Sequence, residues 1–117
     1  MSKPLLIYVA GPYTAERRAD RRNNTERAMD AGLALVAKGH YPVVPHLTHY
    51  LDERCFDLTG GYLVYGFYIA LDDRLLAACD ALFYLAPSPG ADRELARAKR
   101  RGLPIYRTLD EVPDADL

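Results

Sequence analysis

The chain has 117 residues, half of them hydrophobic, which suits one domain with a buried core and leaves little room for a second. Its 15 basic and 16 acidic side chains nearly cancel, so the composition does not favour a nucleic acid polymer as partner. No stretch approaches the roughly 18 consecutive apolar residues of a membrane span, and the N-terminus lacks the features of a signal peptide. Cys55 and Cys79 lie far apart without metal-ligand spacing. We therefore expect a single cytoplasmic domain over residues 1–117, with no metal.

The first apolar run, LLIYVA at residues 5–10, predicts a buried parallel strand. Gly11 and Pro12 break this strand, and a glycine here lets a ligand approach the backbone closely. No Walker or GxGxxG pattern follows, so the turn is a weak phosphate-loop signature. A polar loop is expected next. Its basic cluster consists of Arg17, Arg18, Arg21 and Arg22.

A helix is predicted from Thr25. Small and apolar residues recur there at the spacing of one helical face, at Ala28, Ala31, Gly32, Leu35 and Val36. Gly39 supplies the left-handed residue that ends this helix. A second strand over residues 41–44 then completes a right-handed crossover and stops at a proline. His46 is therefore expected at the same sheet edge as Gly11.

Residues 47–61 have a mixed pattern with a Gly-Gly break, and we interpret them as a lid or wall over this edge. Residues 62–79 return to a helical pattern, with Leu71, Leu75 and Ala78 on one stripe. Aromatic residues crowd the first half of this helix, at Tyr62, Tyr65, Phe67 and Tyr68. We expect them to pack in the core or between copies of the chain, in a homodimer or higher homo-oligomer.

The third strand is predicted over residues 81–85, and PSPG ends it. A helix from about Asp92 to Arg101 follows and ends at Gly102. Glu94 would then lie in the first turn, where free backbone N–H groups favour an anionic carboxylate. Complementing the helix dipole in this way is the simplest interpretation of Glu94. A fourth strand is expected at residues 103–106, followed by an acidic, frayed tail.

The alternation of strands and helices predicts an α/β fold, a three-layer sandwich around a mainly parallel sheet of about four or five strands. In such sheets ligands bind at the carboxyl edge. This edge would gather the residues from Tyr8 to Tyr13, His46, the Ser88–Gly90 loop and Glu94, while a helix would have to bring Asp72 there. Two carboxylates without a metal cluster suggest attack on an acetal-like carbon, as in a sugar–base bond.

Four segments of the chain resemble the nucleoside 2-deoxyribosyltransferase superfamily: IYVAGPYT, KGHYPVVPH, ALDDRLLAACDALFYL and SPGADRELARAKRRGLPIY. The resemblance is closest to the small members classed as a domain of unknown function, which share the AGPY and PHLT signatures. It extends from Leu5 to about Val112. The resemblance implies a flavodoxin-like fold and an oligomeric enzyme that needs neither a metal nor an organic cofactor.

The resemblance also implies a reaction. Members of the superfamily break the N-glycosidic bond of a nucleoside or nucleotide with a glutamate nucleophile after the third strand, a position matched by Glu94. Attack gives a covalent glycosyl-enzyme, which water or a second nucleobase resolves with overall retention. Tyr8 matches the tyrosine that orients the nucleophile. Asp72 matches an aspartate that contacts the nucleobase or sugar and assists proton transfer.

Ser88 lies six residues before the matched nucleophile. The branch that acts on 5′-monophosphates has serine there, whereas transferases acting on free nucleosides have aspartate, whose charge would repel a phosphate. Ser88 and the Gly90 turn are therefore expected to hold the 5′ end of the substrate. The basic cluster would add positive charge, or else form a solvated surface. Gly11, Tyr13 and His46 are expected to line the base or sugar pocket, although a local hydrogen-bonding role fits His46 equally well.

Several functions remain open from the sequence, and a purely structural dimer protein is the least expected of them. Hydrolysis of the N-glycosidic bond is the expected one, and base exchange between nucleosides is the alternative within the same chemistry. A non-catalytic nucleotide-binding module is the alternative from another class. Characterised relatives complete the site with a polar residue from a neighbouring subunit's C-terminal segment, and the final EVPDADL offers no clear match for that residue.

Overall fold

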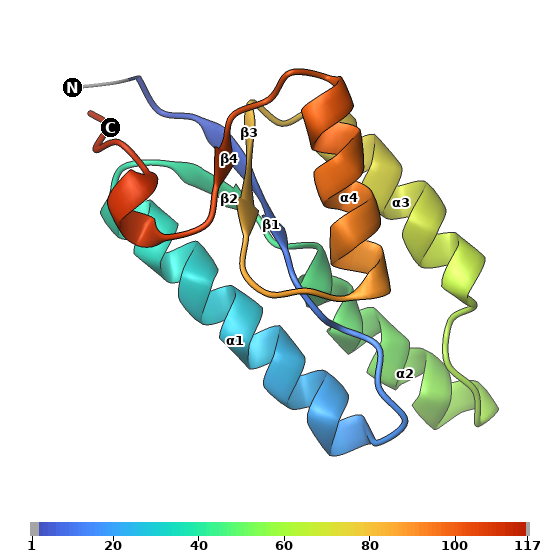
Figure 1. Ribbon diagram of the computed structural model, residues 1–117. Helices are drawn as coiled ribbons and strands as arrows, with labels where there is room; N and C mark the ends of the chain where they lie inside the picture. Colours follow the sequence, from blue (N-terminus) through green and yellow to red (C-terminus); the bar gives the residue numbers. More distant parts are fainter. Residues whose placement is uncertain (1–2, 117) are drawn as a thin grey trace.

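The computed structural model describes residues 3–116 as an α/β fold (Figure 1). Its sheet contains β1 (Leu6–Ala10), β2 (Tyr41–Val43), β3 (Ala81–Tyr84) and β4 (Ile105–Tyr106), in the order β2-β1-β3-β4. All neighbouring strands are parallel. The chain leaves β1 toward one side for β2 and returns on the other side as β3, so the strand order reverses between β1 and β3. This is the flavodoxin-like arrangement, and the predicted fold class is confirmed.

The two faces of the sheet carry separate cores because successive side chains of a strand point in opposite directions. Ile7 and Val9 face α1 (Arg18–Ala37) and pack with its buried Leu35. Tyr8 and Ala10 face α3 (Tyr65–Ala77) and α4 (Pro89–Arg100). Figure 1 shows α1 on one side of the sheet and α3 with α4 on the other. Tyr8 is therefore buried under the two helices that carry the predicted carboxylates.

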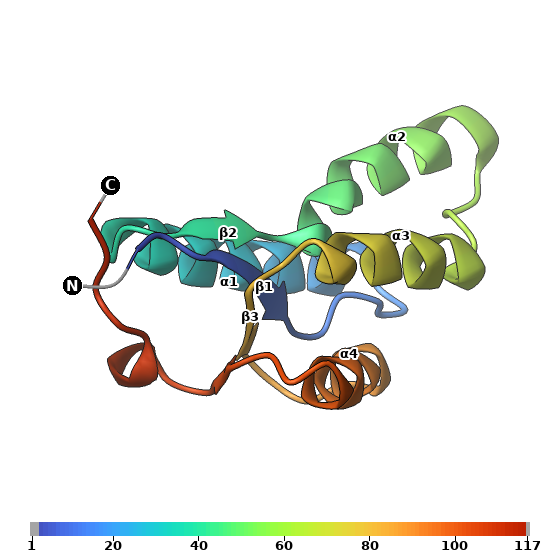
Figure 2. The same ribbon diagram turned by 90° about the horizontal axis from the view of Figure 1, so that it is seen from above.

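The long helix α1 begins at Arg18, so the prediction of an arginine-rich loop before Thr25 was wrong. The first turns of α1 contain no apolar stripe because they pack against polar side chains of the helix that follows β2. The 3₁₀ helix η1 (Pro45–Thr48) leads into α2 (His49–Thr59), and α2 meets α1 through ion pairs. Figure 2 shows α2 extending away from the sheet. Periodicity of apolar residues could not reveal a helix end that is stabilised by charge.

The helix α4 begins at Pro89, three residues before the predicted Asp92. Ser88 is its N-cap: the Ser88 Oγ accepts a hydrogen bond from the Ala91 amide at 3.0 Å. Proline is favoured directly after such a cap because its missing N–H would have had no partner. Glu94 consequently lies in the second turn of α4, and the predicted first-turn position beside free backbone N–H groups was wrong.

The helix α3 begins at Tyr65, later than predicted, because the preceding segment is held extended by a hydrogen bond from the Leu63 amide to Asp52 at 2.8 Å. Its buried residues are Tyr68 and Leu76. Ala78, which the sequence pattern placed on one stripe with Leu71 and Leu75, is exposed. The strands β2, β3 and β4 are each shorter than predicted, by one or two residues.

The C-terminal segment is docked rather than frayed, which corrects the prediction. After the 3₁₀ helix η2 (Leu109–Glu111), Val112 is buried in the core on the α1 side. The Ala115 amide donates to the Lys38 carbonyl at 2.9 Å. Gly39 has φ 91°, and a Cβ at this position would lie 2.2 Å from the Ala115 carbonyl oxygen. Gly39 therefore ends α1, as predicted, and also makes room for the tail.

None of the helices in residues 3–116 has both the length and the apolar character needed to cross a membrane.

Candidate active site

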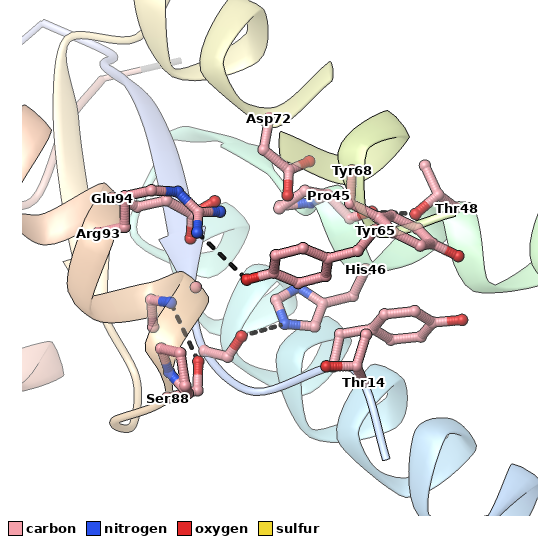
Figure 3. A pocket seen from close by; sticks show the side chains of 15 residues that line it. Thr14, Pro45, His46, Thr48, Tyr65, Tyr68, Asp72, Ser88, Arg93 and Glu94 are labelled. Atoms are coloured by element: carbon pink, nitrogen blue, oxygen red, sulfur yellow. Dashed lines mark hydrogen bonds between the residues drawn. The ribbon is translucent and has the colours of Figure 1, made fainter. Parts of the chain in front are cut away.

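A pocket of about 320 Å³ opens at the carboxyl ends of β1 and β3, where the strand order reverses. The loop after β1, η1, α3 and the start of α4 surround it (Figure 3). All predicted site residues except Tyr8 line this pocket, and Tyr8 contacts one of them from below. The lining consists of Gly11, Tyr13, Thr14, Pro45, His46, Thr48, Tyr65, Tyr68, Asp72, Ser88, Pro89, Gly90, Ala91, Arg93 and Glu94.

Glu94 and Tyr8 form a buried hydrogen-bonded pair. The Tyr8 hydroxyl donates to Glu94 Oε2, and the two residues are 0% and 5% exposed. Burial raises the pKa of Glu94 to about 8, although the hydrogen bond from Tyr8 acts in the opposite direction. Burial also raises the pKa of Tyr8, which stays a donor. Burial thus favours the protonated form of Glu94, whereas the sequence predicted an anion stabilised by the helix dipole.

Asp72 faces Glu94 from the neighbouring helix α3, as Figure 3 shows. Burial raises the pKa of Asp72 to about 6, while the positive charge of Arg93 acts against this rise. The charge of Asp72 in turn raises the pKa of Glu94. Because the two carboxyl groups are coupled, they should be treated as a pair that holds one proton between about pH 6 and pH 8. Such a pair can supply an acid and a carboxylate together.

The start of α4 forms one wall of the pocket with Ser88 and Gly90. The Ser88 oxygen is occupied as an acceptor by the Ala91 amide, but its own hydroxyl proton remains available for a ligand. Gly90 lies in the first turn and presents no side chain to the pocket. This wall can donate hydrogen bonds to an anionic or hydroxylated group.

His46 and Gly11 form the wall at the end of β1. His46 Nε2 lies 3.0 Å from the Gly11 carbonyl oxygen, so this nitrogen must carry the hydrogen. The imidazole is 4% exposed, and burial lowers its pKa, which keeps it neutral. A Cβ on Gly11 would approach the Leu85 side chain at 3.3 Å. His46 therefore lines the pocket and also holds the loop after β1, so the two interpretations of this residue are compatible.

Tyr13 reaches the pocket from the same loop and is anchored by a buried aspartate. The Tyr13 hydroxyl donates to Asp52 Oδ2 at 2.7 Å, and Arg21 Nη1 lies 3.0 Å from the same oxygen. Burial alone would raise the pKa of Asp52, but these donors together with the Leu63 amide lower it. Asp52, on α2, therefore holds three segments together: the loop with Tyr13, α1 through Arg21, and the segment before α3 through Leu63.

The basic cluster has no place in the pocket lining, so the first of its two interpretations, added positive charge at the pocket, finds no support in the contacts. Arg21 pairs with Asp52, and Arg18 pairs with Glu53 at 3.5 Å and Asp57 at 3.3 Å. Its other members make exposed pairs within α1, Arg17 with Asp20 and Arg22 with Glu26. These arginines face α2 or solvent because the early start of α1 turns them away from the sheet edge.

Arg93 and Asp52 are the residues that sequence reasoning missed. Arg93 lines the pocket and donates to the Tyr65 hydroxyl at 3.2 Å. The sequence did contain a pattern that includes Arg93: Arg93, Arg97 and Arg101 recur every four residues along α4 and its C-cap, a spacing that places them on one face. No comparable signal marks Asp52, whose partners come from three separate segments.

Comparison with known proteins adds no family assignment: no protein-family model matches the chain, and no curated protein is significantly similar to it. Among residues 3–116, no three His, Cys, Asp or Glu side chains are grouped as the ligands of a metal ion would be.

Proposed function

We propose that this protein cleaves the N-glycosidic bond of a nucleoside 5′-monophosphate or nucleoside through a covalent glycosyl-enzyme on Glu94. The observation that carries the proposal is the buried Tyr8–Glu94 hydrogen bond beside Asp72, in a pocket at the carboxyl edge of the sheet. Burial of both carboxyl groups gives the pair one proton to move at neutral pH. Acid-assisted displacement at an anomeric carbon requires a carboxylate nucleophile and a proton donor, and two carboxyl groups that share one proton can supply both.

In the first step, the proton of the pair moves from Glu94 to Asp72. The ionised Glu94 attacks the anomeric carbon through the oxygen that Tyr8 does not hold, forming a C–O bond while the C–N bond breaks. Asp72 gives its proton to the departing nucleobase, so the leaving group departs neutral. The hydrogen bond from Tyr8 fixes the carboxylate in the orientation needed for attack.

In the second step, Asp72 acts as a base. It takes a proton from water, the water oxygen bonds to the anomeric carbon, and the bond to Glu94 breaks. Two inversions give overall retention. A second nucleobase in place of water would make the same site a transferase.

The test is to incubate the protein with a panel of deoxynucleosides and their 5′-monophosphates and to follow free base by chromatography. Base and sugar product should appear in equal amounts without an added acceptor. Glu94→Gln should abolish turnover, whereas Glu26→Gln, which changes an exposed glutamate on α1, should not. Release of base only when a second nucleobase is present would identify a transferase. Ligand binding without turnover in the parent protein would identify a non-catalytic binding module.

A further inference from the structure

Arg93 is the cation of the pocket. Of the residues between 3 and 116 that line the cavity, it alone carries a fixed positive charge, since His46 is kept neutral by burial. It precedes Glu94 on α4, and Figure 3 shows the two side chains next to each other.

The present partner of Arg93 is weak for a guanidinium. Arg93 Nη1 donates to the neutral hydroxyl of Tyr65 at 3.2 Å, and Tyr65 is 48% exposed at the mouth of the pocket. Arg93 Nε is buried and has no hydrogen-bond partner among the described residues. A guanidinium has five N–H donors arranged to bind carboxylate or phosphate oxygens in pairs, and here most of that capacity is unused.

The next two arginines at this spacing both bond to α3, although Arg97 Nε, like Arg93 Nε, has no hydrogen-bond partner among the described residues. Arg97 pairs with Asp73 at 3.2 Å, and Arg101 donates to the carbonyl oxygens of Leu76 and Ala77 at 3.0 Å each. These contacts hold α4 against α3 independently of Arg93. Arg93 can therefore leave Tyr65 for another partner without separating the two helices.

The guanidinium lies beside the donor wall formed by Ser88 and Gly90. A Cβ placed on Gly90 would be 4.0 Å from Arg93 Nη2. The free hydroxyl proton of Ser88 belongs to the same turn. An anionic group in this corner of the pocket would receive charge-assisted hydrogen bonds from Arg93 and a further one from Ser88.

We propose that Arg93 exchanges the Tyr65 hydroxyl for the phosphate group of the substrate and so makes the pocket select phosphorylated nucleotides over the corresponding neutral nucleosides. This inference rests on the proposed function, which leaves the choice between nucleotide and nucleoside open. The raised pKa of Glu94 supports it, because burial disfavours a second negative charge in the cavity, which would repel a phosphate. Arg93 is thereby a specificity residue, distinct from the groups that act on the glycosidic bond.

The test separates binding from turnover by using the full chain with Glu94→Gln, in which substrate is not consumed. Calorimetric titration is performed with the common deoxynucleoside 5′-monophosphates and the matching deoxynucleosides. Adding Arg93→Gln should weaken nucleotide binding by roughly ten- to a hundredfold and leave nucleoside binding unchanged. Arg93→Lys, which keeps the charge without the paired donors, should fall between. Arg97→Gln is the matched control, since it removes the same charge one turn away and should not change the preference.

The proposal is overturned if Arg93→Gln weakens both ligand types equally, if it weakens neither, if Arg97→Gln has the same effect, or if no nucleotide binds. Thermal melting of each variant establishes that it is folded, and Arg93→Lys keeps the test decisive should Arg93→Gln unfold. Failure of the proposed function is seen separately, as absence of turnover in the parent. An inactive parent that still prefers nucleotides through Arg93 would contradict the cleavage reaction alone.

Discussion

Tyr8 and Glu94 are separated by 86 positions in sequence, yet the hydroxyl of one donates to the buried carboxyl group of the other. The contact joins the middle of β1 to the second turn of α4. It lies between the sheet and the pocket, so a change in Tyr8 alters the proposed nucleophile without reaching the substrate directly. This makes the pair a sensitive point at which to test the proposed chemistry.

Tyr8→Phe should lower kcat on the order of a hundredfold, the loss typical of removing one positioned donor. Because the Tyr8 hydrogen bond lowers the pKa of Glu94, its removal should also move the alkaline limb of the pH–rate profile upward. Tyr84→Phe is the control: it removes a similar bond, from Tyr84 to Asp92 at 2.5 Å, outside the pocket lining. An unchanged profile for Tyr8→Phe would argue against Glu94 as the titrating nucleophile.

The rate should depend on pH as a bell, since the reaction needs the Asp72–Glu94 pair with one proton. Below about pH 6 both carboxyl groups are protonated, and above about pH 8 neither is. The kcat profile over pH 4–10 checks this expectation. A profile that rises steadily to pH 10 would contradict the requirement for an acid.

Folding stability should fall with rising pH because of Glu94. Its pKa is raised from 4.5 to about 8 in the folded protein, so the folded state binds the proton more tightly than the unfolded state. The resulting stabilisation is complete below about pH 4.5 and is lost as the pH rises to 8. The difference between the two pKa values corresponds to a decrease of a few kcal/mol in the free energy of unfolding over this range. Urea denaturation at several pH values measures how the free energy of unfolding changes with pH. In Glu94→Gln this change should be much smaller. An equal change in the parent and the variant would refute the assignment of the pH dependence to Glu94.

Asp52→Asn should destabilise the protein by roughly 3–5 kcal/mol, because it leaves Arg21 beside a neutral group and weakens the contacts to Tyr13 and Leu63. Asp57→Asn, whose partner Arg18 lies on the surface, should cost at most about 1 kcal/mol. Urea denaturation compares the two variants. If both variants lost the same small amount of unfolding free energy, Asp52 would not be the residue that anchors α2.

Gly39→Ala should be far more damaging than Gly102→Ala, although both glycines have positive φ, 91° and 71°. A Cβ at Gly102 meets no atom within 4 Å, so that variant bears only the backbone cost of about 1–2 kcal/mol. At Gly39 the new Cβ would also displace Ala115. Hydrogen exchange should then show faster opening of residues 112–116 in Gly39→Ala alone. Equal protection in both variants would contradict the docking of the tail.

We expect the protein to self-associate through a stripe of exposed apolar residues on η1 and α2. Leu47, Tyr50, Leu51 and Leu58 follow helical spacing and are between 51% and 67% exposed. Light scattering at micromolar concentration should give a dimer or larger assembly, and the double substitution Leu51→Lys with Leu58→Lys should give a monomer. Leu33→Lys, at an exposed position on α1, is the control. A monomeric parent protein would remove this expectation.

The sequence alone was sufficient for the class of fold and for the neighbourhood of the site. Short apolar runs separated by helical patterns predict a parallel sheet, because buried strands and one-sided helices leave those periodicities in the chain. Parallel strands end at one edge, so Tyr8, His46, Ser88 and Glu94 could be assigned to a common place before any contact was known. The left-handed glycine after α1 was equally predictable, since few other residues adopt that conformation.

Only the tertiary structure decided the charges of that site. Whether Glu94 is an anion depends on its burial under α3 and on its neighbours, and neither follows from its position in α4. Arg18 and Arg21 of α1 pair with acidic residues of α2, which the sequence pattern did not reveal. Arg93 faces the pocket while Arg97 and Arg101 hold α4 against α3. Desolvation and ion pairing depend on groups brought together from distant segments, and periodicity within one segment carries no record of them.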